Sequence, residues 1–399
     1  MTQGTSEQRK LPPGILSGAA FLMAVSAIGP GFLTQTTQFT AELGASLAFA
    51  ILVSTIIDIG AQLNTWRVIC ISGQRGQEVA DAVVPGLGWV VTAVIVFGSF
   101  VFNVGNISGC AIGLDALLGL NQIIGASVSA LLAIGLFLRP RMLTGVDWFS
   151  KLLGAAMILM TLYVVLITPP PVGQALHQAI LPERVNFTSI VTLVGGTIGG
   201  YIMFSGAHRL LDGGVKGVEY VGIISWASIR GIVITGIMRS ILFLAVLGVV
   251  QTGAQLNRAA PVFDAFRVGA GKMGYILSGL VFWSAAITSV VGCSYTSISF
   301  IRTKEGDRRR AHMIAGFIIL TLATVIVLKL FGWQPTPLLI LAGTVNGILM
   351  PIILGVILVA AYRKQVMGAY RHPWWASALG ALAWIITLFM AFRTIQNLL

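Results

Sequence analysis

Long apolar runs, separated by short polar or charged segments, extend along nearly the whole 399-residue chain. A helix needs about 20 apolar residues to cross the hydrocarbon core of a bilayer. Prolines that cannot continue a helix border some of these runs, as in the Pro169–Pro171 triplet. The pattern predicts eleven membrane-spanning helices, over residues 15–41, 45–68, 84–114, 120–138, 149–168, 187–208, 225–250, 273–301, 311–330, 336–362 and 374–394.

The composition restricts the class of protein further. Hydrophobic residues make up 56% of the chain and charged residues 10%, whereas soluble domains carry about a quarter charged residues. These values exclude a soluble enzyme, a disordered chain and a secreted disulfide scaffold. The three cysteines, Cys70, Cys110 and Cys293, match no zinc or redox spacing. We therefore expect an all-α polytopic membrane protein.

The positive charge predicts the orientation in the membrane. The formal net charge is +12, and cytoplasmic loops of membrane proteins collect Lys and Arg. With a cytoplasmic N-terminus, 18 of the 25 basic residues fall on the inner side, six fall outside and Arg239 lies within a span. This predicts a protein of the cell (inner) membrane with its N-terminus inside and, after eleven spans, its C-terminus outside. The lipid bilayer is the expected partner, and nucleic acid is not.

Two predicted spans are interrupted by residues that disfavour a helix. The first contains Gly29-Pro30-Gly31, and the sixth has four glycines between positions 195 and 200. Matched Gly/Pro interruptions in corresponding halves of a transporter point to a midplane binding site, although glycines also serve close helix packing. The candidate substrate-binding residues are Gly29, Gly31, Phe32, Thr34, Thr197, Gly199, Gly200 and Tyr201.

The five-span spacing of the breaks predicts an inverted repeat of five plus five helices with one helix added. The expected divisions are a cytoplasmic segment (1–14), a first repeat (15–168), an external loop (169–186), a second repeat (187–362), a cytoplasmic loop (363–373) and a last helix with the C-terminus (374–399).

Two ionisable residues lie inside predicted spans, Asp58 in the second and Arg239 in the seventh. Charges at this depth are costly and mark ion or substrate pathways. Asp58 could bind a proton or cation and Arg239 a substrate carboxylate, or the two could form a structural pair. Asn103, Asn106 and Asn346 could line the same pathway or form interhelical hydrogen bonds.

No phosphate loop, His-rich metal motif or nucleophile elbow is present in the sequence. The expected protein is therefore not an enzyme and needs no cofactor. Its transport would be driven by an ion gradient, with a proton or Na⁺ as the coupling ion, or by the gradient of the solute. A monomer is expected.

The chain also resembles the NRAMP metal-ion transporters. The residues that carry the resemblance are Ile28-Gly29-Pro30-Gly31-Phe32, Gln62 to Arg67 with Ser72, Gly73 and Glu78, Gly113 to Gly119, and Asn346-Gly347-Ile348-Leu349-Met350-Pro351. The resemblance covers most of the chain and implies a LeuT-type fold. It also implies ion-coupled uptake of a divalent metal cation by alternating access.

The metal-binding motifs of that family are altered in this sequence. Gly29 and Phe32 stand where the family has Asp and Asn, and Gly199 to Ile202 replace Met-Pro-His-Asn. The resemblance therefore carries over no metal-binding side chain, and the metal ligands stay unknown. A cation bound here would have carbonyl, hydroxyl and water ligands, which suit a hard ion such as hydrated magnesium.

Two functions stay open at this level. One is ion-coupled uptake of a divalent cation, and the other is ion-coupled transport of a small carboxylate or amino acid through the same broken-helix site. A receptor or structural membrane protein is a third class, for which paired midplane breaks would have little use.

Overall fold

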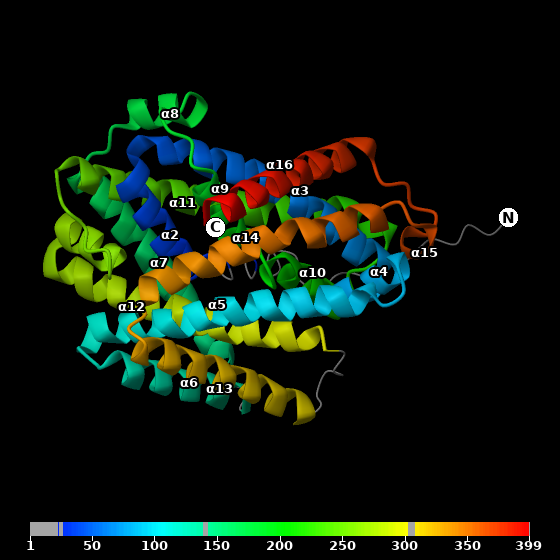
Figure 1. Cartoon of the computed structure of the whole chain (residues 1–399), viewed down its shortest axis with the longest axis horizontal. Helices are drawn as coiled ribbons and strands as arrows, with labels where there is room; N and C mark the ends of the chain where they lie inside the picture. The colour runs from blue at the N-terminus through cyan, green and yellow to red at the C-terminus, as the bar shows by residue number, and fades with distance from the viewer. Residues whose placement is uncertain (1–22, 24–26, 139–142, 302–307, 399) are drawn as a thin grey trace.

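The computed structural model describes residues 23, 27–138, 143–301 and 308–398, and it is helical throughout these ranges apart from turns and loops. Many of the long helices run in a similar direction (Figure 1). The long helices are α3 (Leu47–Ser72), α5 (Leu87–Leu118), α6 (Gln122–Leu138), α7 (Leu143–Ile167), α11 (Val221–Gln251), α12 (Pro261–Ser299), α13 (Arg308–Leu330), α14 (Pro335–Ala360) and α16 (Trp374–Leu398). Shorter helices are α2 (Pro30–Leu43), η1 (Gly44–Ser46), α4 (Gly76–Val83), α8 (Val172–Ile180), α9 (Phe187–Ile198), α10 (Ile202–Asp212), η3 (Val218–Tyr220) and α15 (Lys364–Met367).

Every predicted span has a counterpart among these helices. The number of segments that are long and apolar enough to cross a membrane is nevertheless smaller than the eleven predicted. Among the described residues, eight segments are long and apolar enough to cross a membrane, or nine if the bent pair α7 and α8 forms one span. Pro30–Ser72 counts as one segment, and α6 is short at 17 residues. Most of the first half of the first predicted span lies outside the described residues. The eighth predicted span begins beside a kink at Ala270 and Gly271, and helix α12 extends back beyond it to Pro261.

The outer surface is apolar and the interior contains many polar side chains. Leu131, Leu159 and Trp374 are more than 60% exposed, which a lipid environment tolerates. In contrast, α2 buries the polar run Thr34, Gln35, Thr36, Thr37 and Thr40 almost completely. Polar groups in a span are expected to face protein or an aqueous cavity rather than lipid. The polar residues of α2 therefore lie in the interior of the bundle.

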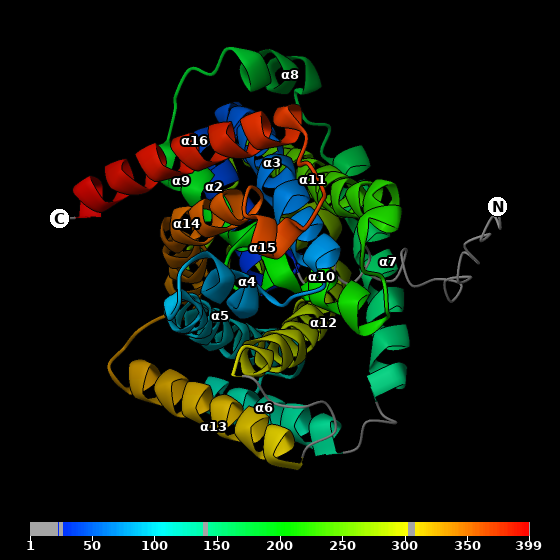
Figure 2. The same cartoon turned by 90° about the vertical axis from the view of Figure 1, so that its right-hand side faces the viewer.

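The broken helices lie in the middle of the bundle. Viewed end-on, α6 and α13 form an outer pair on one side, and α16 crosses the opposite side (Figure 2). Between these layers, α5 packs on α12, α14 on α9, and α3 on α11, while α2 contacts α9, α11, α12 and α14. This arrangement surrounds α2, α9 and α10 with other helices.

Glycines allow α9 and α14 to approach backbone to backbone. A Cβ atom on Gly195 would overlap the carbonyl oxygen of Gly343 and the backbone of Gly347. Small residues at such crossings permit close packing in membranes. Part of the glycine run in the sixth predicted span therefore serves packing, and the break itself starts only after Ile198.

Helix α10, the second half of the broken span, is fixed to the neighbouring helices. The Trp66 indole nitrogen donates to the Met203 carbonyl at 3.1 Å, and Gly206 lies directly against the Trp66 ring. At its far end, Arg75 pairs with Asp212 at 2.7 Å. These contacts position the start of α10 relative to α3.

Candidate transport site between two broken helices

The first break leaves backbone donors without intrahelical acceptors. Helix α2 starts at Pro30, which has no N–H, and Gly29 is extended at φ −97° and ψ −175°. In the described part of the chain, no backbone acceptor is found for the N–H groups of Gly31 and Phe32. Free amides and the helix dipole make such a helix start favourable for negative charge. A Cβ on Gly29 would lie 2.8 Å from the Ser289 hydroxyl, so glycine permits close packing on α12.

The second break leaves backbone acceptors free. Helix α9 ends at Ile198 and α10 begins at Ile202. Gly200 has φ +57°, a left-handed conformation that glycine adopts without steric cost. Within the described residues, no backbone N–H donates to the carbonyls of Gly196, Thr197 or Ile198. The second break thus supplies partial negative charge, whereas the first break supplies partial positive charge.

Asn346 of α14 reaches into the second break. Its amide nitrogen donates to the carbonyls of Gly98 and Ala342, both at 2.9 Å. Its Oδ1 atom is buried without a hydrogen-bond partner and points to the space beside Gly98 and Gly200, where a Cβ would clash with it. An unsatisfied buried oxygen of this kind is available to a ligand.

Arg239 and Asp58 meet at the end of α9. The Arg239 Nη1 atom donates to the Thr197 hydroxyl at 2.8 Å and to the Leu193 carbonyl at 3.3 Å. Asp58 lies near the Thr197 hydroxyl and the Arg239 guanidinium, and that hydroxyl donates to the Leu193 carbonyl at 2.7 Å. The ion pairs found among the described residues are Arg75–Asp212 and Arg267–Asp264, so Asp58 and Arg239 do not form a direct salt bridge. Thr197 lies between them.

Phe32 connects the two breaks. Its ring lies under the Arg239 guanidinium, with the Cζ atom 4.3 Å from the ring centroid. Such stacking is a favourable cation–π contact. Tyr201, on the opposite break, packs edge-on against Phe102 at 5.9 Å between centroids. Phe32 and Thr197 therefore contact the same guanidinium from different halves of the chain.

The other predicted residues lie around this centre with different partners. Asn103 donates to Ser294 at 3.4 Å and to Thr321 at 3.0 Å, and so faces α12 and α13. Asn106 faces the first break, with its Oδ1 atom near Gly29. Thr34 is buried one turn into α2.

Two buried glutamines were not among the predicted site residues. Gln62 lies one turn after Asp58 on α3, and neither side-chain oxygen nor nitrogen has a partner. Gln35 of α2 lies between Gly196 and Gly343, donates to the Leu339 carbonyl at 3.0 Å and keeps its Oε1 atom free. The sequence contains a signal for Gln62, which follows Asp58 by four residues, because residues at this spacing share a helix face.

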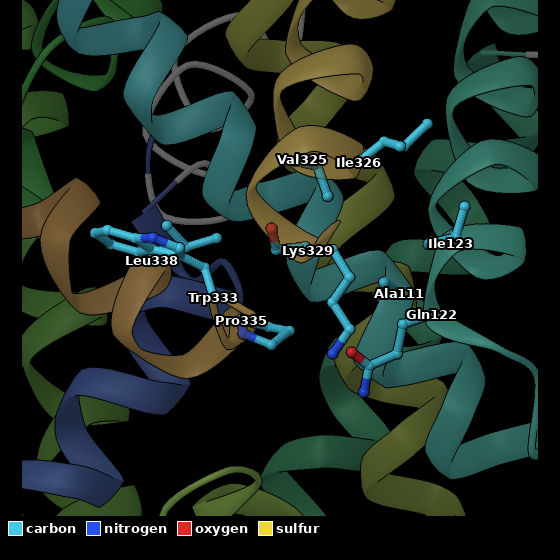
Figure 3. A pocket seen from close by; sticks show the side chains of 10 residues that line it. Ala111, Gln122, Ile123, Val325, Ile326, Lys329, Trp333, Pro335 and Leu338 are labelled. Carbon is cyan, nitrogen blue, oxygen red and sulfur yellow. The ribbon is translucent and has the colours of Figure 1, made fainter. Parts of the chain in front are cut away.

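Two hollows formed by described residues lie away from the helix breaks. A small pocket between α5, α6, α13 and α14 has Lys329 extending towards Gln122 (Figure 3), and none of its lining comes from a break. A cavity of about 440 Å³ between α3, α8 and α11 is lined mainly by apolar residues. Its hydroxyls, Thr55 and Ser240, already donate to their own helices.

Two discontinuous spans that face each other inside a helical bundle define a membrane transporter of the LeuT-type class. The solved structures agree with this fold. An Eremococcus coleocola manganese transporter, crystallised as a point mutant, covers 98% of this chain and 88% of its own with a TM-score of 0.74 at 15% identity. The inward-facing Mhp1 structure covers 96% of this chain and 91% of its own with a TM-score of 0.61 at 15% identity.

The sequence comparisons identify the family. Residues 20–397 match the family described as natural resistance-associated macrophage protein-like, Nramp. A Bacillus subtilis protein named uncharacterized membrane protein YcsG is 48% identical over 96% of this chain and 94% of its own length. The divalent metal cation transporter MntH of Acidiphilium cryptum is 25% identical over 90% of this chain and 84% of its own. The chain belongs to the Nramp family of membrane transporters, and it is not an enzyme.

Proposed function

We propose that this protein is a secondary transporter that carries a divalent cation across the cell membrane by alternating access, with ion coupling. The observation that carries the proposal is the pair of broken helices, with buried oxygen atoms that lack donors beside the second break. The names of the MntH relative and of the Eremococcus coleocola manganese transporter support a divalent metal as the cargo.

The oxygen atoms at the second break form the proposed cation side of the site. The Oδ1 atoms of Asn346 and Asp58 are buried without hydrogen-bond partners among the described residues, and no backbone N–H of those residues donates to the carbonyls of Gly196, Thr197 or Ile198. Among the described residues, no group of three or more His, Cys, Asp or Glu is placed to hold a metal. Neutral oxygens with one carboxylate suit a hard, partly hydrated ion.

The topology completes the proposal. The bias of Lys and Arg supports a cytoplasmic N-terminus and an external C-terminus. The paired breaks support two inverted halves, residues 15–168 and 187–362, that move relative to each other around the site. We propose a monomer as the transporting unit, coupled to a proton or Na⁺.

Uptake into proteoliposomes tests the cargo. Vesicles that contain the purified protein and a metal-sensitive dye should accumulate Mn²⁺ or Mg²⁺ faster than protein-free vesicles. Asn346→Ala should reduce this uptake because it removes a free oxygen at the break. Asn121→Ala is the matched control, since Asn121 lies in the exposed α5–α6 loop. Metal uptake no faster than in protein-free vesicles would refute a divalent cation as the cargo.

A small organic carboxylate or amino acid is the second candidate cargo. The observation that favours it is the buried Arg239 guanidinium, which has unpaired nitrogens at the same centre. A positive charge there disfavours a dication on its own, because like charges repel strongly in a site with little water. Uptake of a radiolabelled carboxylate in the same vesicles, without metal uptake, would favour this second cargo.

A further inference from the structure

The Arg239 guanidinium is buried, and the two nitrogens that carry three of its five N–H donors have no partner. Arg239 is 3% exposed, and its Nη1 atom is satisfied by Thr197 and Leu193. Its Nε and Nη2 atoms have no partner, and no carboxylate lies within 4 Å of it among the described residues. A buried donor that is left without an acceptor is destabilising. The Nε and Nη2 donors are therefore available to a ligand.

The two free nitrogens form one edge of the guanidinium plane. Nε and Nη2 lie side by side, with parallel N–H bonds, and this edge matches the two oxygens of a carboxylate. The Phe32 ring covers one face of the group at 4.3 Å. A ligand therefore has to approach in the plane and engage both nitrogens. This geometry selects a planar bidentate acceptor.

The start of α2 provides a second feature that favours an anion. Phe32 is the third residue of this 14-residue helix, and its ring contacts Arg239. The N–H groups of Gly31 and Phe32 have no backbone acceptor in the described part of the chain. The first turn of α2 and the partly unsatisfied guanidinium are thus in contact through the Phe32 ring, and both stabilise negative charge.

Asp58 sets the charge balance of this centre. The formal charges of Asp58 and Arg239 are opposite and sum to zero without a ligand. A bound carboxylate would leave one negative charge in excess at a buried position, which is unfavourable in a low-dielectric surrounding. A cation beside the free Oδ1 atom of Asp58 would offset that charge. The carboxylate and the cation are therefore expected to bind together.

We infer that Arg239, with the N-terminus of α2, forms a subsite for one carboxylate group of a small organic anion, and that this anion binds together with a cation at the Asp58 side. The inference rests on the proposed transport function. It assigns Arg239 to a carboxylate ligand, and it makes the metal proposal and the carboxylate proposal parts of one site.

Thermal unfolding of the full-length protein in detergent tests the subsite. Sodium acetate, sodium succinate and sodium L-glutamate are the probes. The controls are sodium sulfate at equal ionic strength and acetamide in sodium chloride of that ionic strength. A carboxylate should raise the melting temperature, because a ligand of the folded state stabilises it by mass action. Acetamide has the same shape without the charge and should leave the melting temperature unchanged. An equal shift with sulfate, or none with any carboxylate, would overturn the assignment.

Variants of Arg239 separate the subsite from the cation side. Arg239→Gln should weaken carboxylate binding more than about tenfold because it removes a bidentate charge-assisted pair. Arg239→Lys keeps the charge but not the fork, and should give an intermediate affinity. In both variants, a stabilising shift with MnCl₂ reports that the fold and the cation side are intact. Retained carboxylate affinity in a folded Arg239→Gln protein would contradict the inference.

The same experiment distinguishes two kinds of failure. If MnCl₂ has no effect on the parent protein while carboxylates stabilise it, the metal proposal fails and the subsite stands. If MnCl₂ stabilises it and carboxylates have no effect, the subsite fails and the metal proposal stands. Mutual enhancement of the two shifts, lost in Asp58→Asn, is the result expected for joint binding.

Discussion

Gly200→Ala probes the second break in a way that can be worked out from the structure. Gly200 has φ +57°, and a left-handed conformation costs an L-residue about 1–2 kcal/mol. Its added Cβ would also meet the Oδ1 atom of Asn346. Moving that side chain would break its two hydrogen bonds to Gly98 and Ala342, each worth about 0.5–1.5 kcal/mol. The expected loss in free energy of unfolding is therefore about 2–5 kcal/mol.

Two other glycines separate these contributions. Gly119 ends α5 at φ +65° with open space around its Cβ position, so Gly119→Ala measures the backbone cost alone. Gly316 lies inside α13, also with open space, and its replacement by Ala should be neutral or stabilising by up to about 1 kcal/mol. Unfolding by SDS in mixed micelles gives the three free energies on one scale.

A double variant then tests the contact itself. In Asn346→Ala the obstructing oxygen is absent, so adding Gly200→Ala should cost only the backbone term. The two changes should therefore be less than additive, by about 1–3 kcal/mol, because residues in contact couple in a mutant cycle. Strict additivity, or a Gly200→Ala effect no larger than that of Gly119→Ala, would refute the placement of Asn346 in the break.

Two further predictions address packing and pH. Gly195→Ala should destabilise the protein by more than about 2 kcal/mol, because its Cβ would overlap the Gly343 carbonyl and overpacking against backbone is costly. Unfolding in mixed micelles, with Gly316→Ala as the control, measures this loss. A neutral effect would contradict the close approach of α9 and α14. Burial, with Arg67 as a second cause, lowers the pKa of His372 from 6.5 to about 4. The unfolded chain then binds more protons between these values, so stability should fall as pH drops from 6.5 towards 4. Melting temperatures across this range should show less pH dependence in His372→Gln, and an unchanged profile would exclude His372 as the cause.

The sequence determines the membrane class and the position of the helix breaks. Apolar runs of about 20 residues are long enough to cross the hydrocarbon core as helices, which satisfy their own backbone hydrogen bonds there. A proline between two glycines, as at Gly29-Pro30-Gly31, cannot continue a regular helix. These properties are local, and each can be derived from a few neighbouring residues. The family resemblance, which the comparisons confirm, extends the same local information to the fold.

The tertiary structure alone decides what the buried polar groups contact. From the sequence alone, Asp58 and Arg239 could form a direct pair, act as separate functional groups or be structural charges. The structure places the Thr197 hydroxyl between them and the Phe32 ring against the guanidinium. These residues come from four different helices, and no periodicity in one helix specifies the register of the others. Which polar atoms stay unpaired depends on packing across the bundle, and that packing decides where a ligand can bind.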